Sequence, residues 1–240
     1  MMPSQACCMD LLKEGAEKFG IYLTSNQLQK FFIYLKELKM WNKRFNLTAI
    51  KDDKQIVIKH FLDSLSLRLV MKNYPRNLVD IGPGAGFPSI PLKIAFPDIK
   101  CSLIESSSKK VDFLLYLKER LNLKQIEIIK ERAERIARGE KRESFECAVA
   151  RAVARLNVLL EYSLPFVKIG GYFIAQKGPD TREIKTAQNA LLVLGGKLAK
   201  IRHLELPFSE ESRCLILIQK VKSTPLKYPR RPGIPKKRPL

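Results

Sequence analysis

Long apolar segments are missing from this 240-residue chain, in which no run of about 18 apolar residues occurs. Residues 1–10 also lack the basic and apolar parts of an export signal. We therefore expect neither membrane insertion nor secretion, and a cytoplasmic protein. With 45% hydrophobic and 28% charged residues, the chain is nevertheless apolar enough to fold around a substantial core.

Cysteine is scarce, with five residues that are never spaced as a Cys-x-x-Cys pair. This spacing supports neither a disulfide framework nor a structural zinc site, and we expect no bound metal. Cys101, Cys147 and Cys214 fall in or beside apolar runs, which predicts thiols that are buried as small hydrophobic groups.

Acidic residues are few, since 24 Asp and Glu stand against 44 Lys and Arg, for a net charge of +20. Such an excess indicates a polyanionic partner, with nucleic acid favoured. Part of the excess is concentrated near the C-terminus, in Lys222, Lys227, Arg230, Arg231, Lys236, Lys237 and Arg238. Residues 223–240 are also proline-rich and poor in apolar residues, so we expect an extended basic tail, either simply solvated or gripping phosphates.

Residues 1–75 predict a helical subdomain. Thr24 and Gln27 fit a capping box, and apolar residues then recur every three or four positions up to Leu38. A second helix is expected over residues 56–71, where Ile58 and Leu62 begin one apolar side.

Apolar runs typical of strands alternate with helical segments over residues 76–222, the expected main domain. Seven strands are expected, at residues 78–82, 101–105, 126–130, 147–152, 172–177, 197–201 and 214–219. Ser107 or Ser108 can cap the helix after the second strand. The expected apolar face of that helix is Val111, Leu114, Leu115, Lys118 and Leu121. The alternation predicts an α/β fold with a mostly parallel sheet covered by helices on both sides.

The first expected strand ends in a Gly-x-Gly-x-Gly segment at residues 82–86. Glycines at the carboxyl end of a first parallel strand indicate a nucleotide-like ligand. Pro88 and Pro91 follow, and they remove two N–H groups that a pyrophosphate would need. A phosphate-free cofactor such as S-adenosylmethionine fits better. Glu105, at the end of the next strand and about 20 residues further on, is placed to bind the ribose of that cofactor.

Motifs along most of the chain carry a family resemblance. They are Trp41-Asn42-Lys43 with Asn46-Leu47-Thr48, His60 with Leu62-Asp63-Ser64, the glycine segment, Lys109-Lys110 with Phe113-Leu114, Arg132-Ala133-Glu134, Arg151-Ala152, Lys177-Gly178 and Tyr228-Pro229-Arg230-Arg231-Pro232-Gly233. Together they resemble the bacterial 16S ribosomal RNA guanine-N7 methyltransferase G family, also called the glucose-inhibited division protein B family. Ser89 departs from the glycine that this family more often has. The resemblance implies a Rossmann-like class I methyltransferase acting on 16S rRNA or the small ribosomal subunit.

The glycine segment, Glu105 and the resemblance together define the expected site. The cofactor-binding residues are expected to be Asp80, Gly82, Gly84, Gly86, Phe87, Glu105, Ala133, Glu134 and Arg151. The RNA-side residues are expected to be His60, Lys109, Lys110, Lys177, Arg213, Arg230 and Arg231. The resemblance implies that Ala133 and Glu134 lie at the adenine and Arg151 near the methionine end. On sequence alone, a charged helix start is the preferred explanation of Ala133 and Glu134, and a hydrogen-bonded helix residue is the preferred explanation of His60.

Transfer of a methyl group to guanine N7 needs no general base, because this nitrogen has a free lone pair and loses no proton. In agreement, the fourth expected strand ends in Ala148-Val149-Ala150-Arg151 and offers no carboxylate there. We expect Arg151 and Lys177 to position the reactants, with alignment as the main contribution to the rate. The alternatives are an RNA 2′-O-methyltransferase and a non-catalytic RNA-binding ribosome assembly factor. A monomer is expected.

Overall fold

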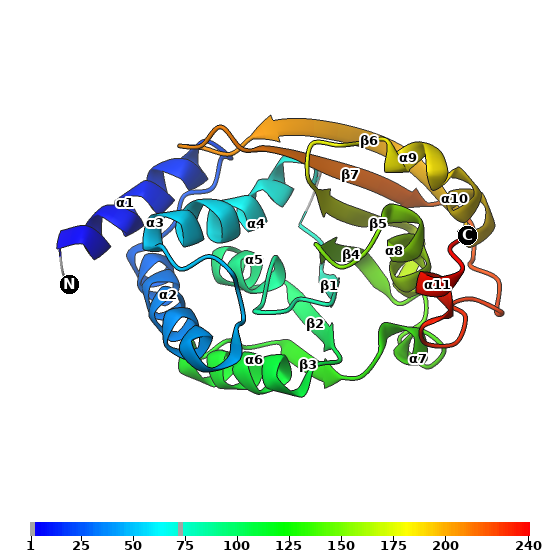
Figure 1. Cartoon of the computed structure of the whole chain (residues 1–240), viewed down its shortest axis with the longest axis horizontal. Helices are drawn as coiled ribbons and strands as arrows, with labels where there is room; N and C mark the ends of the chain where they lie inside the picture. The colour runs from blue at the N-terminus through cyan, green and yellow to red at the C-terminus, as the bar shows by residue number, and fades with distance from the viewer. Residues whose placement is uncertain (1–2, 72–73) are drawn as a thin grey trace.

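The computed structural model describes residues 3–71 and 74–240 and has a seven-stranded sheet at its centre (Figure 1). The strand order is β3-β2-β1-β4-β5-β7-β6. The strands are β1 Asn77–Ile81, β2 Lys100–Glu105, β3 Ile126–Lys130, β4 Phe145–Arg151, β5 Val167–Lys177, β6 Gly196–Glu205 and β7 Ser212–Lys220. β1 to β5 pair in parallel, and β7 is antiparallel to both β5 and β6. The expected seven-stranded, mostly parallel sheet is confirmed.

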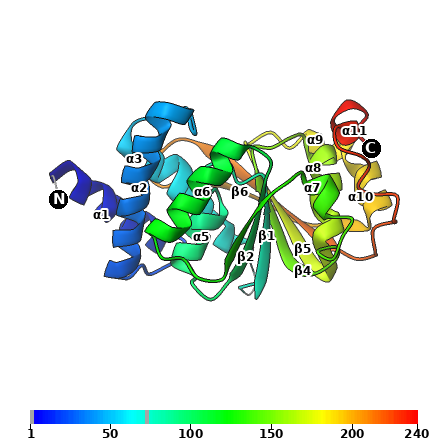
Figure 2. The same cartoon turned by 90° about the horizontal axis from the view of Figure 1, so that it is seen from below.

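Helices cover both faces of this sheet (Figure 2). One face carries α5 Ser89–Ala95 and α6 Ser108–Arg120 beside the N-terminal helices. The other carries α7 Ala133–Ile136, α8 Leu156–Ser163, α9 Glu183–Thr186 and α10 Gln188–Leu194. Neighbouring strand residues alternate between two cores, so that Leu78 packs in the first and Val79 in the second. Burial on both faces explains the long apolar runs of the inner strands such as β1 and β7, whereas the edge strand β6 has no buried residue.

The N-terminal helices are α1 Pro3–Glu17 and α2 Ser25–Phe45. The expected capping box of α2 is confirmed, with Thr24 and Gln27 bonded reciprocally. The Gln27 amide also donates to Ile94 O at 3.0 Å and to Ala95 O at 2.9 Å, which ties α2 to the end of α5. In residues 3–71 and 74–240, none of the helices is long and apolar enough to cross a membrane.

The helical stretch expected over residues 56–71 is confirmed up to residue 69, but it is not one regular α-helix. The segment consists of α3 Asp53–Ile56, a π-helical turn Val57–Leu62, α4 Asp63–Leu65 and a 3₁₀ turn Ser66–Leu69. Residues 72–73, just after the expected helix end, lie outside the described residues. Apolar spacing indicates helical structure but does not distinguish these helix types, and π-helical turns are frequent at functional sites.

The prediction of the apolar face of α6 is partly wrong. Leu115 is 45% exposed, whereas Phe113 and Leu117 are buried beside Val111 and Leu114. Ser107 precedes the helix as its N-cap residue, but its side chain makes no capping hydrogen bond. The buried face is therefore set by the packing of α6 on the sheet and α2, which shifts it from the predicted positions.

The C-terminal residues 223–240 pack against the main domain, so the expected extended tail is wrong. They include the short helix α11 Ile234–Lys237 and bury Tyr228, which is 8% exposed. Arg142 donates hydrogen bonds to Tyr228 O at 2.8 Å and to Thr224 O at 2.6 Å. Hydrogen bonds to tail carbonyl groups supply the attachment that the apolar content of this segment does not predict.

Candidate active site

The loop after β1 adopts a conformation that favours glycine. Gly82, Gly84 and Gly86 have φ angles of +70°, +61° and +104°. A Cβ atom added at Gly86 would lie 2.8 Å from Tyr34 Oη. Tyr34 is buried in α2, and its hydroxyl donates a hydrogen bond to Ala85 O at 2.5 Å. The glycine loop is thus shaped by its own φ angles and by a tyrosine from the N-terminal helices.

Glu105, at the end of β2, faces the glycine loop. Its carboxylate accepts hydrogen bonds from Gly84 N at 3.1 Å and Ser107 N at 2.9 Å. Each carboxylate oxygen keeps a second lone pair for a further donor, such as a ribose hydroxyl. The pocket beside it is lined by Gly82, Glu105, Ala133, Glu134, Val153 and Tyr162, among others. Four of the expected cofactor residues therefore meet in one pocket.

Val153 and Tyr162 are pocket residues that sequence reasoning missed. A Cβ atom at Gly82 would lie 3.0 Å from Val153 Cγ2, so this valine covers the start of the glycine loop. Tyr162 reaches the pocket from α8. Neither residue belongs to a motif or carries a charge, and only the fold brings them to the carboxyl ends of β1 and β2.

Asp80 and Phe87 lie beneath the glycine loop. The Asp80 side chain is 0% exposed, and its Oδ2 accepts a hydrogen bond from Ser89 N at 3.1 Å. Burial raises the pKa of Asp80 to about 7, and Oδ1 has no hydrogen-bond partner within residues 3–71 and 74–240. The Phe87 ring is 5% exposed and stacks on the ring of His60, with centroids 4.4 Å apart. These two residues support the glycine loop from inside.

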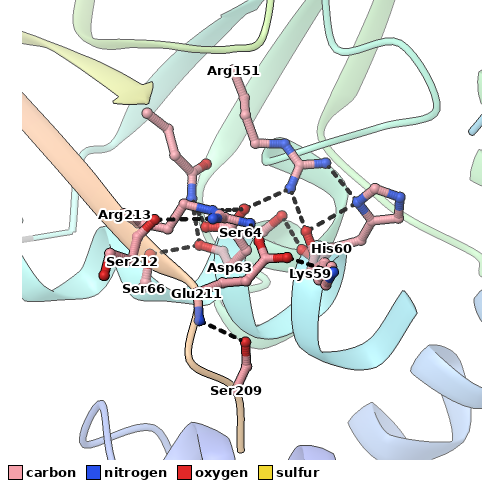
Figure 3. A network of polar contacts seen from close by, with 11 residues as sticks. Lys59, His60, Asp63, Ser64, Ser66, Arg151, Ser209, Glu211, Ser212 and Arg213 are labelled. Atoms are coloured by element: carbon pink, nitrogen blue, oxygen red, sulfur yellow. Dashed lines mark hydrogen bonds and ion pairs between the residues drawn. The ribbon is translucent and has the colours of Figure 1, made fainter. Parts of the chain in front are cut away.

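A second cavity, of about 390 Å³, lies at the carboxyl ends of β4 and β5. It is lined by His60, Asp63, Arg151, Gln176, Lys177 and Arg213, among others. Figure 3 shows the polar network on its wall. Arg151 donates to Lys59 O at 3.0 Å, to Asp63 Oδ2 at 3.2 Å and to His60 Nδ1 at 3.0 Å. The structure thus brings four expected residues, His60, Arg151, Lys177 and Arg213, to one place.

Asp63 is the centre of this network. It is 3% exposed, and its Oδ2 also accepts from Arg213 Nε at 3.2 Å, while Oδ1 accepts from Gln176 Nε2 at 2.6 Å. Burial raises the pKa of the Asp63 carboxyl, and the guanidinium groups of Arg151 and Arg213 oppose that rise. Asp63 is not among the expected site residues and appears in the sequence only within the motif Leu62-Asp63-Ser64. The available signal was an acid inside an apolar helical segment, which is unusual unless the acid is paired.

His60 lines the second cavity in a neutral form. Burial, followed by the charge of Arg151, lowers the pKa of His60 from 6.5 to about 3. Because Nδ1 accepts a hydrogen bond from Arg151, the ring proton is placed on Nε2, which donates to Thr48 Oγ1 at 2.7 Å. The ring lies in the π-helical turn and stacks on Phe87 of the glycine loop.

Two expected lysine sites differ in how far their charge is compensated. Lys177 donates to Ala154 O at 2.7 Å and pairs with Glu183 at 2.9 Å, so its ammonium is already engaged. Lys109 and Lys110 begin α6, and Lys110 Nζ would be 3.9 Å from a Cβ atom added to the glycine loop at Gly84. Lys110 therefore lies beside the glycine loop.

The two expected tail arginines are also placed differently. Arg230 pairs with Glu161 of α8, which is 0% exposed, at 2.5 Å. Neither of the two cavities includes Arg230 in its lining. Arg231, the next residue, is exposed. The charge of Arg230 is thus neutralised within the protein, whereas that of Arg231 faces solvent.

The family model for rRNA small subunit methyltransferase G matches residues 27–213. The chain belongs to this methyltransferase G family. A ribosomal RNA small subunit methyltransferase G from Acetivibrio thermocellus is 50% identical over 96% of each chain. One from Chloroflexus aggregans is 47% identical over 96% of this chain and 97% of its own length. The family resemblance found in the sequence motifs is confirmed.

Solved structures share the fold of this methyltransferase G family member at low identity. The structure of M. jannaschii TYW2 in complex with AdoMet has a TM-score of 0.50 at 16% identity and covers 63% of this chain and 72% of its own. TrmN from Thermus thermophilus has a TM-score of 0.52 at 14% identity, with 69% and 53% covered. With the strand order described above, they confirm the Rossmann-like class I methyltransferase fold.

Proposed function

We propose that this chain transfers a methyl group from S-adenosylmethionine to N7 of a guanine in 16S rRNA. The second cavity is called the cationic cavity, because Lys59, Arg151, Lys177 and Arg213 are in its lining. The observation that carries the proposal is that His60 of this cavity stacks on Phe87 of the glycine loop. When bound, S-adenosylmethionine supplies an electrophilic methyl group. Membership of the methyltransferase G family supports ribosomal RNA as the acceptor.

The pocket residues have distinct roles in this proposal. Glu105 accepts hydrogen bonds from the ribose, and Ala133 and Glu134 flank the adenine. Asp80 and Phe87 hold the loop in shape, and Arg151 lines the cationic cavity. The pocket lining and the hydrogen bonds described above support these roles.

Among the described residues, the acids and the histidine that line the cationic cavity are all paired. Glu211 pairs with Lys59 at 2.5 Å and with Arg213 at 2.7 Å. Asp63 accepts hydrogen bonds from Arg151, Arg213 and Gln176, and His60 Nδ1 accepts one from Arg151. Methylation of guanine N7 is compatible with a cavity lined by paired groups, because this reaction requires alignment of the reactants and no removal of a proton. Holding nucleophile and methyl group in line can supply up to roughly 7–11 kcal/mol, with the guanine taken out of its stack.

We propose further that the protein acts as a monomer in the cytoplasm, on 16S rRNA or the small ribosomal subunit. Residues 1–75 are assigned as the helical subdomain, 76–222 as the methyltransferase domain and 223–240 as the basic tail. The net charge of +20 supports an RNA partner through phosphate contacts.

The test combines purified protein, methyl-labelled S-adenosylmethionine and small-subunit RNA, followed by mass mapping of the labelled nucleotide. We expect N7-methylguanine. A transcript carrying 7-deazaguanosine in place of guanosine should accept no label, because the nucleophilic nitrogen is absent. Label on a ribose or on an exocyclic amine would contradict the proposal.

A further inference from the structure

The tail, residues 223–240, is fixed to α8 by an arginine–glutamate pair. Arg230 donates to Glu161 Oε1 through its main-chain N at 2.8 Å and its Nε at 2.9 Å, and to Oε2 through Nη2 at 2.5 Å. Glu161 is 0% exposed. A guanidinium that meets a buried carboxylate in this forked geometry is strongly oriented, so Arg230 holds the tail in one position.

Two arginines of the main domain fix the tail main chain. Arg142 donates to Thr224 O and Tyr228 O, and Arg138 Nη2 donates to Pro229 O at 2.8 Å. Figure 1 shows the tail, in red, beside α7 and α8. The tail is thus held by Arg230, which reaches from the tail to α8, and by Arg138 and Arg142, which reach from the main domain to the tail main chain.

The docked tail reaches the cofactor pocket. Gly233 N donates to Glu134 Oε1 at 3.3 Å, and Glu134 lines the pocket and is 3% exposed. In α8 the residue after Glu161 is Tyr162, which lines the same pocket. Two walls of the pocket are therefore connected to the tail, one directly and one through α8.

We propose that Arg230 and Gly233 are positioning residues for cofactor binding, acting through Tyr162 and Glu134. Arg231 and the lysines of α11 are exposed and serve RNA contact instead. The inference rests on the proposed function, because the pocket is taken to bind S-adenosylmethionine. Undocking the tail releases two pocket walls, so affinity for the cofactor falls.

The main test is Gly233→Val, which leaves the charged groups in place. Gly233 has a φ of +85° and open space around its Cα, so valine there strains the docked backbone without a clash. We expect the Kd for S-adenosylmethionine, measured by calorimetry on the full chain, to rise roughly five- to thirtyfold. The KM for the cofactor should rise with it, while kcat at saturating cofactor stays unchanged.

Two control variants separate this effect from other causes. Gly170→Val introduces valine at a φ of +84°, also in open space, near the start of β5, and should leave cofactor affinity unchanged. Arg231→Ala removes the neighbouring exposed charge and should weaken RNA binding only. Arg230→Ala should show the cofactor defect more strongly, but it also leaves Glu161 buried without its partner.

The outcomes are distinguishable from failure of the proposed function. Wild-type protein that does not bind S-adenosylmethionine would overturn the proposed function itself. Wild-type binding with equal affinity in Gly233→Val would overturn only the role of the tail. Equal weakening in Gly233→Val and Gly170→Val would also overturn it, because the loss would then be general destabilisation.

Discussion

At the scale of single residues, the site depends on polar side chains that are buried and already paired. Asp63 accepts hydrogen bonds from two arginines and a glutamine that come from three different strands. Removing one member of such a buried ion pair typically costs about 3–5 kcal/mol, because the others are left uncompensated. Asp63, Arg151 and Arg213 therefore act as one rigid unit, which suits a reaction that requires alignment.

Glu105→Ala tests the cofactor pocket at this scale. Hydrogen bonds to a charged group contribute roughly 1.5–3 kcal/mol, so we expect the Kd for S-adenosylmethionine to rise about 10- to 100-fold. Affinity for RNA should not change. Calorimetry for the cofactor and filter binding for RNA measure the two. Glu127→Ala is the control, since Glu127 pairs with Ser102 and Lys141 and does not line the cofactor pocket.

His60→Gln tests the electrostatics of the cationic cavity. The pKa of His60 is lowered from 6.5 to about 3, so between these values the unfolded chain binds a proton that the folded protein excludes. The free energy of unfolding therefore rises with pH across this window, by about 2 kcal/mol between pH 5 and 6.5 from this group.

In His60→Gln this part of the pH dependence should disappear, as measured by urea unfolding at pH 5 and pH 7.5. His203→Gln, which changes an exposed histidine of β6, should retain the wild-type dependence. A His60→Gln protein with the same pH dependence as wild type would show that the imidazole is not excluded from protonation.

At the scale of elements, the sequence predicts those features that depend on residues close together in the chain. The strands followed from apolar runs, and the glycine loop with Glu105 followed from spacing. The π-helical turn Val57–Leu62 did not, because apolar spacing does not distinguish helix types, and its contact between His60 and Phe87 joins residues far apart in the sequence. Asp63 and Gln176 were missed as site residues for the same reason, since their partners come from other elements.

Gly86→Ala tests the glycine loop as an element. A Cβ atom there would lie 2.7 Å from Ile90 Cγ1 and 2.8 Å from Tyr34 Oη, at a φ of +104°. Such overpacking costs roughly 1–3 kcal/mol, so we expect a lower Tm and loss of cofactor binding. Gly139→Ala is the matched change, because the nearest atom to its Cβ would be 3.7 Å away. Equal Tm values in both variants would contradict the close approach at the glycine loop.

At the scale of the whole molecule, the net charge is +20. Some of the positively charged side chains form ion pairs inside the fold, and others are exposed on the surface. Arg151, Lys177 and Arg230 are each paired with an acid inside the fold. Only cations that face solvent can replace the counterions of RNA. The charge relevant to RNA binding is therefore carried by exposed lysines and arginines, including those of the tail.

The double change Lys236→Gln and Lys237→Gln tests this division, because both lysines are exposed in α11. If each contacts one phosphate of single-stranded RNA, the slope of log affinity against log salt should flatten by roughly 0.7 per lysine. Titrations of RNA binding at salt concentrations from about 50 to 200 mM measure the slope. Cofactor affinity should stay at the wild-type value, because Arg230 and Gly233 still dock the tail. An unaltered slope in the α11 variant would show that the tail serves the cofactor pocket alone.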